Sequence, residues 1–278
     1  MPPFLALAFP DIDPVIVSFG PIAIRWYALS YVAGLFLGWW IMTRLAERPP
    51  APGMAPVLTK AMVDDFLLWA TLGVILGGRL GYVLFYNPAH FAVHPMDIIK
   101  VWSGGMSFHG GLLGVVAAVI LFARRRGVPI LALGDLCCLV APIGLFFGRI
   151  ANFINGELYG RPTDVPWGVI FPTAKDGLPR HPSQLYEAAM EGLVLLLILA
   201  ALARFAHARG QPGLITGAFL LGYGFFRSVA ELFRQPDAHI GFLSGATTMG
   251  QWLSVPVAAA GVALIWAALA GRTKTGRT

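Results

Sequence analysis

Seven long apolar stretches alternate with short polar segments along the chain. A helix that crosses the hydrocarbon core of a bilayer needs about 20 mostly apolar residues. The third stretch qualifies only if the glycine-rich GGMSFHGG at its start lies within the protein interior. The pattern predicts an all-α integral membrane protein with seven transmembrane helices, built as one polytopic domain over residues 1–278. The predicted spans are roughly 22–43, 66–86, 107–123, 131–152, 186–205, 213–233 and 249–270.

Composition supports this fold class. The 278 residues are 57% hydrophobic and only 12% charged, whereas soluble domains carry about 25% charged residues. A net charge of +6 is also found in proteins that bind nucleic acid. Here, however, no basic stretch is interleaved with exposed aromatic residues, and membrane proteins carry Lys and Arg for topological reasons. We therefore expect no nucleic-acid partner. Cys137 and Cys138 are adjacent in an apolar run, so they predict neither a disulfide nor a metal site.

The distribution of Lys and Arg predicts the orientation. With the N-terminus outside, the basic run Arg124–Arg126 and the basic C-terminal segment 272–277 both fall on the cytoplasmic side, where such residues concentrate in membrane proteins. The C-terminus is then cytoplasmic. Residues 153–185 form the longest external connection, and their Pro and Gly punctuation predicts a small irregular or hairpin-bearing outer cap.

Polar residues recur in the outer half of the predicted bundle. An ionisable residue inside a bilayer costs about 2.5–3.5 kcal/mol on insertion scales and is a functional candidate by default. Arg149 and Asn152, three residues apart on one helical face, end the fourth span, and His109 starts the third. Arg227 lies roughly 21 Å from the cytoplasmic end of the sixth span at 1.5 Å per residue. The other polar residues placed in this layer are Arg25, Tyr27, Arg79 and Tyr82, together with Tyr223, Glu231 and Arg234, which form a stripe with Arg227.

Several arginines with one histidine and few carboxylates predict an anion site, because the planar guanidinium matches phosphate geometry. At this depth the expected anion is a phospholipid headgroup that enters from the outer leaflet. His90, His94 and Asp97 have helical metal-ligand spacing, but Pro95 interrupts the helix, so we expect no metal there.

Other interpretations stay open for single residues. Arg25 alone is better explained by a side chain that reaches the membrane interface, and an isolated His109 by a structural hydrogen-bond donor. A lipid or anion transporter would also place arginines near a cavity, but transporters usually show internal repeats and broken helices at the midplane, and the sequence shows no repeat. An intramembrane protease is a third possibility. Ser107 lies near His109, but no G-x-S-x-G occurs.

The segment GRIANFINGELYGRPT, residues 148–163, resembles the signature of the bacterial prolipoprotein diacylglyceryl transferases. The agreement extends over about residues 12–265. Ala151 stands where the family usually has glycine, and the connection from residues 171–172 to RHPSQLYE looks shorter than in some members. The other matching motifs are RWYALSY, GGRLGYVLFYN, GGMSFHGG, RHPSQLYE, GYGFFRSVAELFRQPD and TTMGQWLSVP.

The resemblance implies transfer of the diacylglyceryl group from phosphatidylglycerol to the lipobox cysteine of exported prolipoproteins, with release of glycerol 1-phosphate. This is the first step of bacterial lipoprotein maturation, and it needs no cofactor and no metal. The implied location is the inner membrane among membrane lipids, with the active site toward the outer leaflet.

Two arginines aimed at the leaving phosphate would stabilise the charge that it gains, and Arg149 and Arg227 are the candidates. Either His109 or Tyr27 is the expected base for the thiol, and this choice stays open. The resemblance adds Asn152 and Tyr27 as essential polar residues and implies a phosphatidylglycerol site. The residues expected in that site are Arg149, Asn152, Glu157, Gly160, Tyr223, Arg227 and Glu231.

Overall fold

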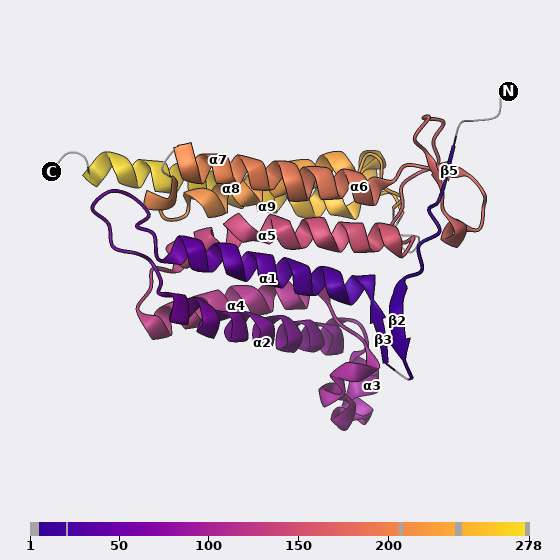
Figure 1. Ribbon diagram of the computed structural model, residues 1–278, viewed down its shortest axis with the longest axis horizontal. Coiled ribbons are helices and arrows are strands. Elements are labelled where there is room, and N and C mark those ends of the chain that lie inside the picture. Colours follow the sequence, from indigo (N-terminus) through magenta and orange to yellow (C-terminus); the bar gives the residue numbers. More distant parts are fainter. Residues whose placement is uncertain (1–5, 21, 206–207, 237–240, 276–278) are drawn as a thin grey trace. The chain divides into compact units, whose positions relative to one another are not determined.

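A computed structural model describes residues 6–20, 22–205, 208–236 and 241–275 of the chain (Figure 1). The chain forms two compact units. The first consists of Met1–Ile41 and Cys137–Thr278, and the second of Met42–Leu136. The chain passes between them inside two long helices, α1 (Trp26–Ala46) and α5 (Ile130–Ile154).

Six helical segments in the described part of the chain are long and apolar enough to cross a membrane. They include α1, α5, α2 (Lys60–Phe85), α4 (Phe108–Arg126) and α9 (Met249–Thr275). The remaining one, Ser183–Phe205, consists of α6 (Ser183–Glu187), the π-helical segment η4 (Ala188–Val194) and α7 (Leu195–Phe205). A further apolar helix, α8 (Leu214–Ala230), has 17 residues. The prediction of a helical integral membrane protein is confirmed.

Several predicted boundaries differ from the structure; α2, for example, begins at Lys60 and not at residue 66. The first helix begins at Trp26, not at residue 22, because Ile22–Arg25 forms strand β3 and pairs antiparallel with β2 (Val15–Phe19). The sixth predicted span ends at Ala230, three residues early, and residues 231–233 form a turn. The remaining short helices are α3 (Pro88–Val93), η1 (Pro95–Ile99), η2 (Val101–Ser103), η3 (Pro172–Ala174), η5 (Ala208–Gly210) and η6 (Ser244–Ala246).

Residues 153–185 contain the hairpin that their composition suggested. Strand β4 (Val169–Ile170) pairs antiparallel with β5 (Pro179–Arg180), and β1 (Leu7–Ala8) adds to β4 in parallel. The N-terminal segment and the predicted cap thus share one small sheet.

In the second unit, local signals mark the ends of the helices. The Thr59 side chain accepts a hydrogen bond from the Met62 amide and caps α2, and Ser107 does the same for α4 through Gly110. Gly127 ends α4 in the left-handed region at φ 66°, a conformation that glycine adopts without a Cβ penalty. The basic run Arg124–Arg126 lies in the last turn, where positive charge favours the helix dipole.

Helices α2 and α4 run side by side (Figure 1), and their backbones approach closely where glycines of the two helices face each other. A Cβ on Gly114 would lie 1.9 Å from the carbonyl oxygen of Gly73, and one on Gly77 would lie 2.4 Å from that of Gly110. In a lipid environment, where apolar side chains gain little by association, such close backbone contact supplies the packing energy between helices. In the first unit, Gly217 and Gly224 let α8 approach α9 in the same way.

This packing predicts that Gly114→Ala destabilises the protein. The added methyl group meets the backbone of α2, so the helices must separate, at a cost of about 1–3 kcal/mol for overpacking. The measurement is the thermal unfolding midpoint of the detergent-solubilised protein. Gly144→Ala in α5 is the control, because a Cβ there meets nothing within 4 Å, and we expect its midpoint to match the wild type. Equal midpoints for both variants would contradict the proposed packing.

Candidate active site

Glu187 lies where three arginines meet in the first unit. Its Oε2 atom is 2.7 Å from Nε of Arg149 on α5 and 3.0 Å from Nη1 of Arg227 on α8. Its Oε1 atom is 3.3 Å from Nη1 of Arg234, which follows α8. The Glu187 side chain is fully buried at the end of α6. One carboxylate therefore joins arginines from two helices and the turn after one of them.

Two further carboxylates complete an ion cluster. Glu231 forms an ion pair with Arg227, four residues earlier on the same helical face, and lies 3.9 Å from Arg234. Glu191, one turn after Glu187 and within η4, lies 3.6 Å from Arg149 and 3.8 Å from Arg227. We call these residues the ion cluster. Its members in the described part of the chain are Arg149, Glu187, Glu191, Arg227, Glu231 and Arg234.

The expectation of a site with few carboxylates was wrong. Buried charges are costly unless they are paired, and here each arginine of the cluster lies against at least one buried carboxylate. The sequence contained a signal that would have revealed this pairing. Glu187 and Glu191 are four residues apart in an otherwise apolar helix, a spacing that places both on one face.

Asn152 and Glu157 lie at the end of α5 beside the cluster. The Asn152 side chain donates a hydrogen bond to Oε1 of Glu157 at 2.7 Å, and its backbone carbonyl accepts from the Glu157 amide. Tyr31 donates to the hydroxyl of Tyr27 at 3.3 Å, one turn away on α1. Tyr31 also lies close enough to Glu157 and Arg149 to interact with them electrostatically. Among the residues expected in the site, the structure places Asn152 against Glu157. It adds Tyr31, which the sequence did not single out and which interacts with Tyr27, Glu157 and Arg149.

Tyr223 lies on α8, one turn before Arg227. It interacts electrostatically with Glu191, Arg227 and Arg149. Together with Arg227 and Glu231 it forms the stripe that the four-residue spacing predicted.

The signature segment holds the end of α8. The Gly160 amide donates to the carbonyl of His181, and the Arg161 amide donates to that of Phe233, each at 2.8 Å. The guanidinium of Arg161 donates to the carbonyls of Glu231 and Arg234, both at 2.9 Å. A Cβ at Gly160 would lie 2.5 Å from the Phe233 oxygen, so only glycine fits at this point of the segment. Close packing therefore explains why glycine occupies position 160 in this chain.

His181, whose backbone carbonyl accepts the hydrogen bond from the Gly160 amide, lies outside the helical spans. Its Nδ1 atom is 3.1 Å from the hydroxyl of Tyr186. Burial, together with the nearby Arg161 charge, lowers the pKa of its imidazole below the ordinary value. His181 is therefore held mostly neutral at neutral pH.

His109 belongs to the second unit, whereas the residues of the ion cluster belong to the first. It is exposed in the first turn of α4, and its ring packs edge to face against Phe108. Arg79, in the same unit, is buried. Its guanidinium donates to backbone carbonyls, including those of Ile98 at 2.8 Å and Gly105 at 3.1 Å. Arg79 therefore organises the loop after α3.

His90, Asp97 and Lys100 form a surface ion network in that loop. Lys100 Nζ is 2.6 Å and His90 Nε2 is 3.1 Å from the Asp97 carboxylate. Lys100, with His90 in support, holds the pKa of Asp97 below its usual range. Within the described ranges no group of three His, Cys, Asp or Glu residues is arranged to hold a metal ion.

These features define an integral membrane protein whose polar centre is a buried set of arginine–glutamate ion pairs beside the signature segment. The chain belongs to the prolipoprotein diacylglyceryl transferase family, whose model matches residues 14–267. It is 60% identical over 258 residues to the phosphatidylglycerol–prolipoprotein diacylglyceryl transferase of Rhodospirillum rubrum, which covers 92% of each chain.

Two further relatives carry the same description. The protein of Paramagnetospirillum magneticum is 56% identical over 264 residues, 94% of this chain and 96% of its own. The protein of Methylocella silvestris is 57% identical over 263 residues, 95% of this chain and 96% of its own. Membership of the family makes this chain a transferase.

The contacts of Gly160 predict that Gly160→Ala lowers transferase turnover. The methyl group pushes the signature segment away from Phe233 and His181, and a displacement of about 1 Å at a catalytic site costs on the order of 100-fold in rate. The measurement is turnover in detergent, with limited proteolysis of residues 153–185 as a readout of the displacement. Gly144→Ala serves as the control. Unchanged turnover and proteolysis in Gly160→Ala would refute this role.

Proposed function

We propose that the chain transfers the diacylglyceryl group of phosphatidylglycerol to the lipobox cysteine of exported prolipoproteins, and that Arg149 and Arg227 bind the lipid phosphate. One observation supports the choice of these arginines. A single anionic oxygen, Oε2 of Glu187, lies within 2.7 Å of one guanidinium and 3.0 Å of the other. Two helices therefore present donors that converge on one oxygen atom, which is the arrangement that a phosphate oxygen requires.

The chemistry follows from the charge of the lipid. The cysteine sulfur attacks the carbon of the diacylglyceryl group that bears the phosphate, a carbon–sulfur bond forms, and the carbon–oxygen bond to phosphate breaks. The phosphodiester carries one negative charge, and the departing glycerol 1-phosphate gains a second on its oxygen. Arginines placed at that oxygen bind the transition state more strongly than the substrate, which is the requirement for catalysis. No metal or cofactor takes part.

The thiol proton needs an acceptor, because a cysteine of ordinary pKa, about 8.5, is only a few per cent thiolate at pH 7. We keep His109 and Tyr27 as the two candidates. Tyr27 already shares a hydrogen bond with Tyr31, whereas His109 is exposed at the start of its helix. The remaining residues of the proposed phosphatidylglycerol site are Asn152, Glu157, Gly160, Tyr223 and Glu231.

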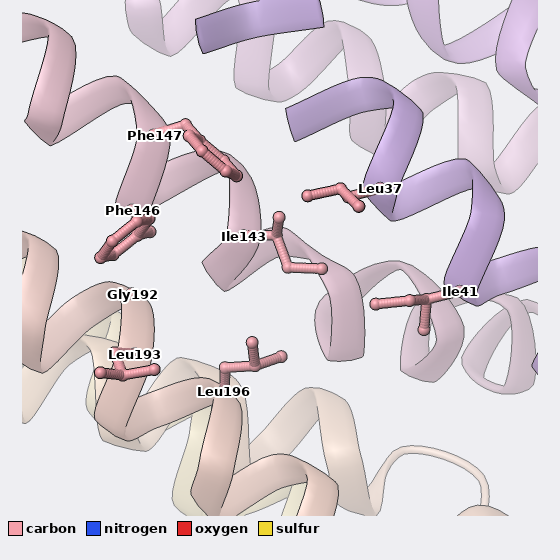
Figure 2. A pocket seen from close by; sticks show the side chains of 8 residues that line it. All are labelled: Leu37, Ile41, Ile143, Phe146, Phe147, Gly192, Leu193 and Leu196. Atoms are coloured by element: carbon pink, nitrogen blue, oxygen red, sulfur yellow. The ribbon is translucent and has the colours of Figure 1, made fainter. Parts of the chain in front are cut away.

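An apolar pocket beside the ion cluster fits the acyl part of the lipid. It has a volume of about 230 Å³ and is lined by side chains of α1, α5, η4 and α7 (Figure 2). Its wall residue Phe146 precedes Arg149 by three positions on α5, and Gly192 directly follows Glu191. Charged and apolar surfaces are therefore adjacent along the same two helices, which suits an amphiphile. The lining residues are Leu37, Ile41, Ile143, Phe146, Phe147, Gly192, Leu193 and Leu196.

We also propose that α8 is the seventh span. Its 17 residues extend about 26 Å, close to the roughly 30 Å hydrocarbon core. With the basic run Arg124–Arg126 on the cytoplasmic side, the N-terminus lies outside, the C-terminus lies inside and residues 153–185 form an outer cap. The enzyme would then sit in the bacterial inner membrane with its active site toward the outer leaflet, where it meets phosphatidylglycerol and the lipobox of the prolipoprotein.

The test is reconstitution with phosphatidylglycerol and a lipobox peptide, measuring glycerol phosphate release together with the mass increase of the cysteine. We expect Arg149→Gln and Arg227→Gln each to lower turnover by about 100-fold or more, the size of effect seen when one preorganised donor is lost. If His109 is the base, His109→Gln should lower turnover by about 100-fold. If Tyr27 is the base, Tyr27→Phe should lower turnover by the same factor. Arg124→Gln, in the last turn of α4, is the matched control and should keep wild-type turnover.

Glycerol phosphate release that does not depend on the peptide thiol would contradict the proposed transfer reaction. Near-normal turnover in both Arg149→Gln and Arg227→Gln would instead show that the lipid phosphate binds at other residues.

The pocket predicts a chain-length effect for Leu196→Trp. The larger ring fills the pocket and excludes about two methylenes of an acyl chain, worth about 0.8 kcal/mol each, so KM for long-chain phosphatidylglycerol should rise about tenfold. KM for a dioctanoyl lipid should change little. Leu197→Trp is the control, because Leu197 is the next residue on the helix and is 59% exposed. If both variants raise KM equally, or neither does, the pocket does not hold an acyl chain.

A further inference from the structure

Glu191 differs from the other carboxylates of the ion cluster in how it is held. Its side chain is fully buried, yet among the described residues neither of its oxygens accepts a hydrogen bond. Its distances to Arg149 and Arg227 are 3.6 and 3.8 Å. Glu187, by contrast, has arginine nitrogens at 2.7, 3.0 and 3.3 Å. Glu191 is a buried carboxyl group without the hydrogen bonds that normally stabilise an ionised one.

The charges of the cluster balance in the absence of lipid. In the described part of the chain, three arginines face three glutamates. A phosphatidylglycerol phosphate adds one negative charge to this buried set. An uncompensated charge in a low-dielectric site is strongly unfavourable, so lipid binding requires either a new cation or the neutralisation of one carboxylate.

The contacts decide which carboxylate is neutralised at the lowest cost. Protonation of Glu187 would weaken three short ion pairs, and protonation of Glu231 would weaken its pair with Arg227. Protonation of Glu191 breaks no hydrogen bond and weakens only two long contacts. The groups that face Glu191 are Arg149 from α5, Arg227 and Tyr223 from α8, Glu187 from α6 and Arg234 after α8.

We propose that Glu191 is the counter-ion that the lipid phosphate replaces, and that it takes up one proton when the headgroup binds. The proposal rests on the proposed function, because it uses phosphatidylglycerol as the anion at Arg149 and Arg227. The carboxylate and a proton from water form the carboxylic acid, and no other bond changes. The proton returns to water when the phosphate product leaves. Glu187 stays ionised and is a positioning residue that keeps the two arginines aimed at one point.

The sign of the resulting pH dependence follows from linkage. A ligand whose binding takes up a proton binds more weakly as pH rises, by about tenfold per pH unit where the unliganded carboxyl is ionised. A permanently neutral Gln at position 191 needs no proton. Its affinity for the lipid should therefore stay constant over the same pH range.

The experiment is calorimetric titration of the purified protein in detergent with dioctanoyl phosphatidylglycerol, in two buffers of different ionisation enthalpy. The difference in heat gives the number of protons taken up. We expect about one for the wild type and about zero for Glu191→Gln, which should still bind. Arg124→Gln, in the last turn of α4 and outside the cluster, is the control and should keep the uptake of about one proton. Glu187→Gln removes one negative charge from the same cluster, so its proton uptake should also fall, and its kcat should fall as well because the arginines lose their common partner. Glu187→Asp should restore part of that kcat.

Each outcome separates the two proposals. Lipid binding by the wild type without proton uptake, or equal uptake by Glu191→Gln, overturns the role of Glu191 and leaves the proposed function standing. A wild type that does not bind phosphatidylglycerol overturns the proposed function itself. If Glu191→Gln does not fold, infrared difference spectra of the wild type decide the matter. A new protonated-carboxyl band on lipid addition supports the proposal, and its absence refutes it.

Discussion

The structure depends on a constraint that operates throughout its first unit, namely that charge inside a membrane protein must be compensated. Arg149, Arg227 and Arg234 are brought to one place by α5, α8 and the turn after α8, and Glu187 compensates all three at once. Removing one member of a buried ion pair leaves the other uncompensated, which costs about 3–5 kcal/mol. Helix positions in this unit are therefore tied to the same contacts that define the site. A π-helical segment, a feature often found at functional sites, carries Glu191 toward the cluster.

Close backbone contact at glycines packs helices within each of the two units. Gly114 of α4 meets Gly73 of α2, and Gly217 of α8 meets Gly261 of α9, at distances that no Cβ would permit. Because α8 carries Arg227, the close approach of α8 to α9 also limits where that guanidinium lies. The packing of small residues and the placement of charge are thus parts of one arrangement.

The fold was largely predictable from the sequence because a span of about 20 apolar residues has few alternatives in a bilayer. Helices α2, α4, α5, α7 and α9 appear where the apolar runs predicted them. The helical start at Trp26 was not predictable, because the apolar residues of β3 also suit a helix and only their pairing with β2 decides the matter. The arginines of the site were predictable from their cost in a membrane. Glu187 and Glu191 were not predicted as site residues, because the positions of the arginines do not indicate which carboxylates neutralise them. The four-residue spacing of the two glutamates does indicate that they share one helical face.

Glu231 connects two parts of the first unit through different atoms. Its side chain pairs with Arg227 in the ion cluster, while its backbone carbonyl accepts a hydrogen bond from Arg161 in the signature segment. A shift of that segment by a fraction of an ångström moves the carbonyl, and the carboxylate moves with it because both belong to one residue. The protein therefore has a short mechanical link, one residue long, between the signature segment and the ion cluster. A displacement at one end of this residue is thus transmitted to the other without any change in the helices between them.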